Sequence, residues 1–208
     1  MERDLLPLFP LQLVLFPGTQ IPLHIFEDRY KEMIGDAISA GTEFGVVRAG
    51  ERGIVNTGCT AIVERVLRRY PDGRLDILAA GRRRFEILGL NDDKAYLRGS
   101  VDFYDDDDFE PVPEETTKKA MEGFEELKQL KGDEVEEPAP GHPRLSFQIA
   151  QPVEDLDFRQ VLLATRSEAQ RMKQLAEFLS GYVNRERAIQ HVRDVAPRNG
   201  HGKLPVNL

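Results

Sequence analysis

The 208-residue sequence has little of what several classes of protein need. It contains a single cysteine, Cys59, which excludes a disulfide framework and any zinc or iron–sulfur site built from several cysteines. No apolar run approaches the roughly 20 residues that a membrane-spanning helix requires. The start of the chain lacks a basic stretch followed by an apolar one, as a secretory signal would have. These absences predict a cytoplasmic protein with no membrane segment.

An excess of basic residues is also absent. Lysine and arginine number 28 against 36 aspartate and glutamate, which gives a net charge of −8. Dedicated nucleic-acid binders normally show the opposite balance. Acidic residues are most concentrated over 101–137, between two stretches, 48–100 and 138–208, that hold a small basic excess.

Short apolar segments dominate the first hundred residues, which predicts strands. The expected strands are residues 13–16, 44–47, 59–70, 75–80, 85–88 and 96–104. A Pro-Asp-Gly turn at 71–73 joins two of them as a hairpin. Repeated short strands at this spacing are typical of a β-sandwich or a small barrel.

One amphipathic helix interrupts these strands. Its apolar residues fall on a single face, at positions 30, 33, 34, 37 and 38. Gly41 is a suitable stop just beyond the last of them. A helix at this place can cover one end of a barrel.

The pattern becomes helical after an acidic segment that contains prolines. Expected helices span 117–131 and 158–164, and the longest begins at Ser167, which forms a capping box with Gln170. We therefore expect four parts, which are a β-rich domain at 1–105, an acidic linker at 106–116, a helical subdomain at 117–196 and a flexible tail at 197–208.

Several motifs, taken together, resemble the N-terminal domain family of Lon protease. They are LFPL at 8–11, LFPG at 15–18, PLHIFEDRY at 22–30, GCTAIV at 58–63, DGR at 72–74, GRRRF at 81–85 and SEAQR at 167–171. The resemblance covers residues 5–190 or so. It implies an α+β fold, in which a PUA-like β pseudo-barrel with an embedded helix is followed by a C-terminal helical subdomain.

Most residues in these motifs are expected to serve the fold. Proline fixes φ and glycine permits turns that other residues resist, which suits a loop before the helix. A carboxylate such as Glu27 favours the positive end of the helix that follows it. The expected structural residues are Phe16, Pro17, Gly18, Pro22, Phe26, Glu27, Tyr30 and Gly81.

No motif for catalysis is found. A phosphate-binding loop needs G-x-x-x-x-G-K-[ST], whereas Gly202-Lys203 is followed by Leu204. Cys59 has no neighbouring base, and the four histidines are too scattered to suggest a zinc site. We therefore expect no catalytic residue, no metal and no cofactor. The ATPase motor and Ser–Lys peptidase of Lon protease are not expected here, and the chain is predicted not to be an enzyme.

Charged residues outside the structural positions are the candidates for contacts with a partner. Asp28, Lys31 and Glu32 fall on the polar side of the first helix. Arg82 and Arg84 belong to an arginine cluster, and strand alternation predicts that both face the same side.

These interpretations favour a non-catalytic module that binds polypeptide, as the resemblance to a substrate-recognition domain implies. Its expected partner is an unfolded or a specific polypeptide, which a bacterial-type adaptor would deliver to a separate protease in protein quality control. The alternative is a PUA-like RNA-binding protein that uses the Arg82–Arg84 cluster. The acidic charge and the lack of an aromatic stacking series make nucleic acid the less favoured partner. The oligomeric state stays open.

Overall fold

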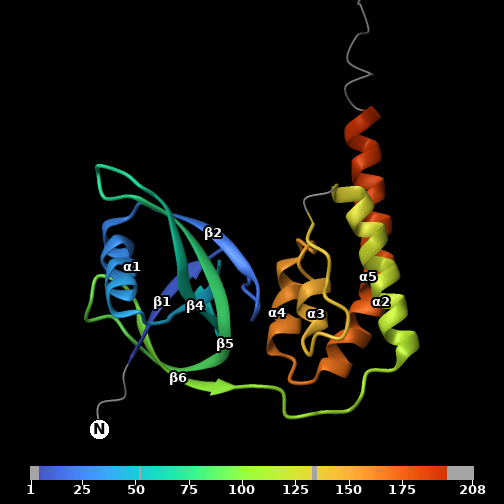
Figure 1. Cartoon of the computed structure of the whole chain (residues 1–208), viewed down its shortest axis with the longest axis horizontal. Helices are drawn as coiled ribbons and strands as arrows, with labels where there is room; N and C mark the ends of the chain where they lie inside the picture. Colours follow the sequence, from blue (N-terminus) through green and yellow to red (C-terminus); the bar gives the residue numbers. More distant parts are fainter. Residues whose placement is uncertain (1–4, 52, 133–134, 196–208) are drawn as a thin grey trace, which may run out of the picture. The chain divides into compact units, whose positions relative to one another are not determined.

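The computed structural model describes residues 5–51, 53–132 and 135–195 (Figure 1). Contacts divide the chain into two compact units. The first unit comprises the residues up to Phe109 together with Val153–Ser167, and the second comprises Glu110–Pro152 together with the residues from Glu168 onward. The expected single helical subdomain at 117–196 differs from this division, because residues 153–167 cluster with the strands. The expected tail at 197–208 lies outside the described residues.

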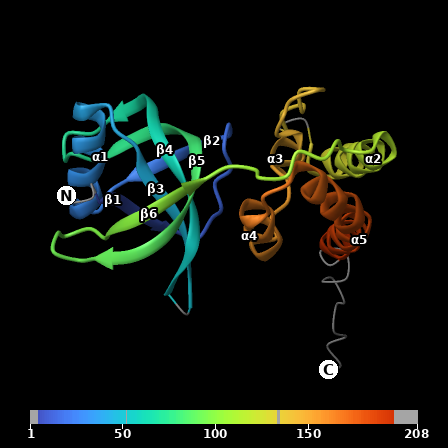
Figure 2. The ribbon, with the colours of Figure 1, turned by 90° about the horizontal axis from the view of Figure 1, so that it is seen from below.

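Six strands form one curved sheet in the first unit. They are β1 (Leu6–Leu11), β2 (Gln20–Ile25), β3 (Phe44–Gly50), β4 (Gly53–Arg69), β5 (Leu75–Asn91) and β6 (Arg98–Tyr104). Their order is β2-β5-β4-β3-β1-β6, and β6 also pairs with β5, so the sheet curls back on itself (Figures 1 and 2). β1 and β3 are parallel, whereas the other pairs are antiparallel. This α+β architecture is the PUA-like pseudo-barrel that the resemblance implies.

The core of the first unit combines apolar side chains from strands that are distant in sequence. Leu8 of β1, Val47 of β3 and Phe85 of β5 are fully buried in one cluster. Burial of side chains of this size contributes about 1.5–3 kcal/mol each to stability, before the entropy of ordering them is counted. The cluster joins β1, β3 and β5 in one core.

The expected embedded helix is confirmed as α1 (Asp28–Ala40), which follows β2. Its apolar stripe is buried, with Met33 and Ile34 almost completely inaccessible. Gly41 ends the helix in the left-handed conformation, with φ 63°, and its N–H bonds to the Ala37 carbonyl. Glycine adopts this conformation without the steric penalty of a Cβ.

Helix α4 (Leu156–Ala164) belongs to the first unit. Asp155 caps it by accepting a hydrogen bond from the Phe158 N–H at 2.9 Å. Two side chains of α4 then reach the loops and strands of the first unit. Arg159 donates to the Val14 carbonyl at 2.9 Å, and Gln160 donates to the Thr57 carbonyl at 3.0 Å. These bonds tie the segment to residues 145 and 103 positions earlier in the chain.

The second unit consists of α2 (Glu114–Lys131), α3 (Leu145–Ile149) and α5 (Glu168–Val195). α2 and α5 pack closely, because Gly123 leaves room for the Leu179 side chain; a Cβ at Gly123 would lie 2.7 Å from Leu179. The fully buried Arg171 donates to Ser146 Oγ at 2.9 Å and to Glu168 at 2.7 Å, which joins α3 to α5. No helix in the described parts of the chain is long and apolar enough to cross a membrane.

Two strand predictions are wrong. Residues 13–16 form no strand, although they are apolar; Val14, Leu15 and Phe16 are buried in a loop after β1. Burial without periodicity does not distinguish a strand from a buried loop. Residues 75–80 and 85–88 are not separate strands but parts of β5, because Gly81 continues the ladder instead of ending it.

Candidate functional site

The loop at Phe16–Gly18 closes on Gly81 and sets the start of β2. Gly18 has φ 77°, and its N–H donates to the Gly81 carbonyl at 2.9 Å. The Gly81 N–H donates in return to the Thr19 carbonyl at 2.8 Å. A Cβ at Gly81 would lie 2.1 Å from the Phe16 carbonyl oxygen, so only glycine fits there. The structure thus brings the loop and Gly81 together, and Pro17 is buried within the loop.

A groove with a volume of about 670 Å³ opens beside this part of the fold. It lies where β1 and β2 end and α1 begins, and we call it the β1–α1 groove. Its lining residues are Phe9, Pro10, Leu11, Gln12, His24, Ile25, Phe26, Glu27, Arg29, Tyr30 and Ala49.

Aromatic side chains form the apolar part of the groove. The rings of Phe9 and Tyr30 are 4.3 Å apart between centroids, and both side chains are almost fully buried. Burial raises the pKa of the Tyr30 hydroxyl, and the nearby Arg29 partly opposes this shift. Phe26 differs from them because 59% of it is exposed. A large apolar side chain is therefore presented to solvent at the rim of the groove.

The charges in the groove compensate each other. Arg29 pairs with Glu27 at 2.7 Å, and its guanidinium lies 4.5 Å from the Tyr30 ring centroid. Glu27 is the N-cap residue of α1, but its side chain makes no capping hydrogen bond. Its carboxylate is instead turned to Arg29. The groove is therefore largely apolar, and the ion pair at its rim has no net charge.

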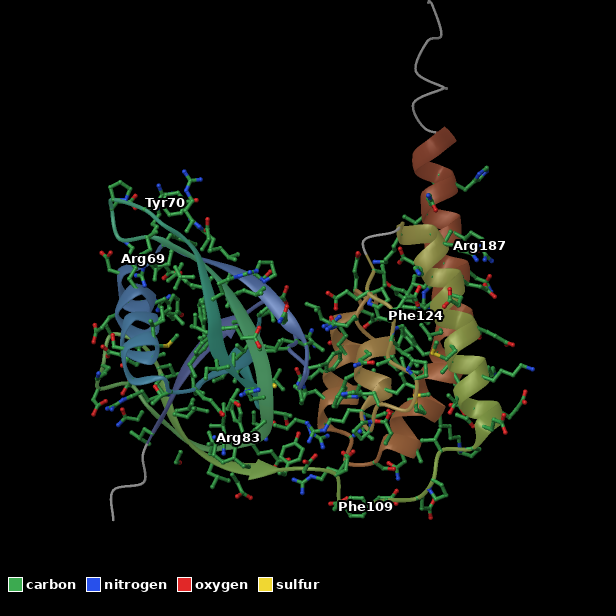
Figure 3. All side chains as sticks on the ribbon, viewed as in Figure 1. Arg69, Tyr70, Arg83, Phe109, Phe124 and Arg187 are labelled. Carbon is green, nitrogen blue, oxygen red and sulfur yellow. The ribbon has the colours of Figure 1, made fainter. Side chains whose placement is uncertain are left out.

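A second group of side chains adjoins the groove through His24. His24 Nδ1 lies 2.5 Å from Asp76 Oδ1, and the Tyr70 hydroxyl donates to Asp76 Oδ2 at 2.8 Å. The guanidiniums of Arg68 and Arg74 lie 4.5 and 4.8 Å from the Tyr70 ring centroid. We call these five residues the Tyr70 cluster; Figure 3 shows Tyr70 and the neighbouring Arg69 at the turn between β4 and β5.

Hydrogen bonding within the Tyr70 cluster shifts the pKa values of two of its side chains. The bonds from His24 and Tyr70 stabilise the ionised carboxylate, so the pKa of Asp76 is below its usual range. The bond to Asp76 likewise stabilises the protonated phenol, so the pKa of Tyr70 is above its usual range. Asp76 is therefore a carboxylate already held by two neighbours.

The three charged candidates on α1 have different surroundings. The Asp28 side chain is 98% exposed and pairs with Lys31 at 3.0 Å. Lys31 also donates to the Asp72 carbonyl at 3.3 Å, so it connects α1 to the β4–β5 turn. Glu32 is exposed, and Lys94 is 3.8 Å away. Asp28 and Glu32 remain accessible, whereas Lys31 is engaged within the fold.

The expectation that Arg82 and Arg84 face the same side of the sheet is wrong, because β5 contains a β-bulge at this point. Gly81 pairs with Ala61 and Arg84 pairs with Cys59, so three steps along β5 match two steps along β4. The extra residue changes the parity of the strand. Arg82 is consequently exposed while Arg84 is buried.

Arg84 is therefore not accessible to a partner, contrary to the expectation. Its side chain is 1% exposed, and it donates to Asp106 at 2.5 Å and to the Thr165 carbonyl at 2.7 Å. Its guanidinium also lies 4.9 Å from the Tyr104 ring centroid. Arg84 thus fixes the segment after β6 and the end of α4 within the first unit. Part of the expected acidic linker is consequently bound to the fold.

Sequence reasoning did not single out Phe9, Tyr70, Arg74 or Asp76 as site residues. Their association depends on the strand register, which places His24 opposite Asp76 and Asp76 opposite Arg68. The available signal was the Pro-Asp-Gly turn, since it brings residues on its two sides together. No group of three or more potential metal ligands occurs among the residues that the structure describes.

The fold and the groove define a class of protein before any relative is considered: a PUA-like pseudo-barrel with an accessible apolar groove, joined to a helical unit. Residues 5–184 match the model of the ATP-dependent protease La (LON) substrate-binding domain. The chain belongs to this family.

Curated relatives show the same relationship. The chain is 32% identical over 112 residues to Lon protease of Parabacteroides distasonis, which covers 50% of this chain and 14% of the relative. It is 33% identical over 105 residues to Lon protease of Flavobacterium johnsoniae, which covers 46% and 13%. The matches thus span only a small part of the length of these relatives.

Solved structures agree on the fold. The Lon N-terminal domain protein from Xanthomonas campestris has a TM-score of 0.67 and 25% identity, covering 84% of this chain and 98% of that one. The N-terminal domain of Mycobacterium avium complex Lon protease has a TM-score of 0.53 and 16% identity, covering 85% and 98%. The second likeness concerns the fold alone. The predicted fold class and the resemblance to the Lon N-terminal domain family are both confirmed.

Proposed function

We propose that the chain is a non-catalytic module that binds polypeptide segments with exposed large apolar side chains, and that the β1–α1 groove is the binding site. The observation that carries this proposal is the exposed Phe26 at the rim of an aromatic groove. Membership in a substrate-binding domain family supports it.

The chemistry of the groove suits loosely specific binding. Enclosing one large apolar side chain contributes about 1.5–3 kcal/mol. Ordering a flexible ligand opposes part of this gain, so the expected affinity is modest. Folded proteins bury most of their large apolar side chains, whereas unfolded ones expose them. The groove would therefore distinguish unfolded from folded proteins without reading one sequence.

The lining residues also support a role in binding without catalysis. None of them is a serine, threonine, cysteine or lysine that could act as a nucleophile. The groove's own carboxylate, Glu27, is paired with Arg29, and His24 is paired with Asp76. We propose that the protein acts in the cytoplasm as an adaptor for protein quality control, passing unfolded chains to a separate protease.

The alternative function, RNA binding through Arg82 and Arg84, has lost its structural basis. Arg84 is buried and bound to Asp106, so the cluster cannot present both guanidiniums to a phosphate backbone. The family that residues 5–184 match is a substrate-binding domain, which does not favour this alternative.

A binding assay tests the proposal. Fluorescence anisotropy with a labelled, chemically unfolded protein should show saturable binding, and the same protein in its folded state should compete poorly. Phe26→Ala should weaken binding roughly tenfold, since an exposed aromatic anchor is lost. The matched control is Phe109→Ala, because Phe109 is 85% exposed elsewhere in the first unit and is not part of the groove. Equal affinity for folded and unfolded protein would contradict the proposal.

A further inference from the structure

We infer that the β1–α1 groove and the Tyr70 cluster form one continuous binding surface, and that this surface selects extended polypeptide segments in which a large apolar residue is close to acidic residues. The inference rests on the proposed function and specifies its substrate class.

Continuity follows from the sheet register and from ring contacts. His24, Asp76 and Arg68 occupy one row across β2, β5 and β4. Directly opposite residues in antiparallel strands share a face, so this row lies on one side of the sheet. His24 stacks on Phe26 at 5.9 Å and meets the edge of the Tyr70 ring at 5.8 Å. A chain that leaves the groove over His24 therefore reaches Tyr70.

The acidic groups near this path are already engaged. Asp76 is bonded by His24 and Tyr70, as described above. Asp72 pairs with Arg74 at 2.7 Å, and Glu64 accepts a hydrogen bond from Gln20 at 2.6 Å. These bonds reduce the capacity of the three carboxylates to attract basic side chains of a ligand.

Two basic groups on the same face of the sheet are not bonded in this way. Arg65 and Arg68 are exposed, and neither forms an ion pair with a residue that the structure describes. Arg68 stacks on the Tyr70 ring, which orients its guanidinium while leaving it accessible. Guanidiniums present several N–H donors in a planar fork that fits a carboxylate. Charge complementarity thus favours an acidic ligand beside the apolar groove.

The strand spacing sets the expected separation between the two features. β2 and β4 lie on either side of β5, so Arg68 is two strand spacings, about 10 Å, from His24. An extended polypeptide rises about 3.3 Å per residue. The acidic residues of a ligand should therefore begin about three residues from its apolar anchor.

Labelled peptides of one length test this inference with the full chain. Each carries the same Phe-Leu core, flanked at a distance of three residues by aspartates, serines or lysines. We expect the aspartate peptide to bind about fivefold more tightly than the serine peptide and the lysine peptide to bind more weakly than both, with differences that shrink as salt is added. The double variant R65Q/R68Q should lose this preference but keep its affinity for the serine peptide.

The matched control is Arg82→Gln, which removes an exposed arginine from the β-bulge. Its neighbour Arg83 lies at the opposite end of the first unit from Tyr70, on which Arg68 stacks (Figure 3). We expect R82Q to keep the preference for aspartate. Loss of the preference in R82Q, with retention in R65Q/R68Q, would overturn the location that we assign.

Failure of the proposed function and failure of the acidic preference give different results. If no peptide binds, the proposed function itself fails. If all three peptides bind equally, the proposed function stands and the acidic preference is wrong. Tighter binding of a labelled uridine-rich RNA than of any peptide, lost in R65Q/R68Q, would assign the surface to RNA instead. Sedimentation that shows a dimer displaced by the aspartate peptide would assign it to a second copy of this chain.

Discussion

Gly81 and Arg84 are three residues apart on β5, and both are buried. The first position admits no side chain, whereas the second encloses a large charged one. Gly81 has no room for a side chain, because the Phe16 carbonyl occupies the space that a Cβ would need. Arg84 is a large charged side chain enclosed by partners that neutralise it. The motif GRRRF suggested Gly81 as a structural residue, but the burial of Arg84 follows from a bulge that no local pattern predicts.

Gly81→Ala should lower the free energy of unfolding by about 1–3 kcal/mol or more, because the added methyl group meets backbone that cannot move aside freely. Urea denaturation followed by circular dichroism measures the change. Gly35→Ala is the matched control, since a Cβ there meets nothing within 4 Å and lies in the interior of α1. That variant should gain up to about 1 kcal/mol. Equal effects at the two sites would contradict the close approach at Gly81.

Arg84→Met should destabilise the protein by about 3 kcal/mol, because it leaves Asp106 poorly accessible and without its guanidinium partner. Arg82→Met, on the exposed side of the bulge, should change stability by less than about 0.5 kcal/mol. The same denaturation experiment compares both variants with the unmodified chain. A loss at Arg82 as large as that at Arg84 would show that the bulge does not separate the two side chains.

Among the elements, a helix whose apolar residues recur at a regular helical spacing could be predicted from the sequence. Features that depend on the pairing register of the strands could not. The stripe in α1 and its stop at Gly41 follow from spacing alone. The absence of a strand at 13–16 does not, because that apolar loop is buried against partners far away in the sequence. The β1–α1 groove is likewise formed by the ends of elements that are separate in sequence. Its exposed anchor, Phe26, was expected to be structural because it lies inside a family motif.

The contact between β2 and β5 should depend on pH through Asp76. Its pKa is lower in the folded protein than the ordinary value of about 3.9, so the ionised form stabilises the fold. This contribution is fully present above the ordinary pKa and is lost as the pH falls through the lowered one. Thermal unfolding between pH 2 and 6 should show a smaller acid-induced loss of stability in Asp76→Asn than in the unmodified chain. Parallel curves for the two proteins would contradict the prediction.

At the scale of the whole molecule, the family relationship concerns one part of the Lon proteases. The matched family model describes a substrate-binding domain, and the matched stretch is 14% of the length of the P. distasonis protein. Fold membership alone does not establish an activity, so the function is argued from the groove. The purified chain should hydrolyse neither ATP nor labelled casein above the rate of a buffer blank. Hydrolysis that persists through further purification steps would contradict the expectation that the chain is not an enzyme.

The return of residues 153–167 to the first unit affects the order of events during synthesis. A ribosome delivers the last strand, β6, well before α4, so the Val14 carbonyl has no Arg159 to bind until about 55 further residues have been made. At about 5–20 residues per second, this delay is on the order of 3–11 s. For that interval the nascent chain exposes apolar segments that its finished form buries. A newly made molecule is then itself the kind of polypeptide that a completed molecule is proposed to bind.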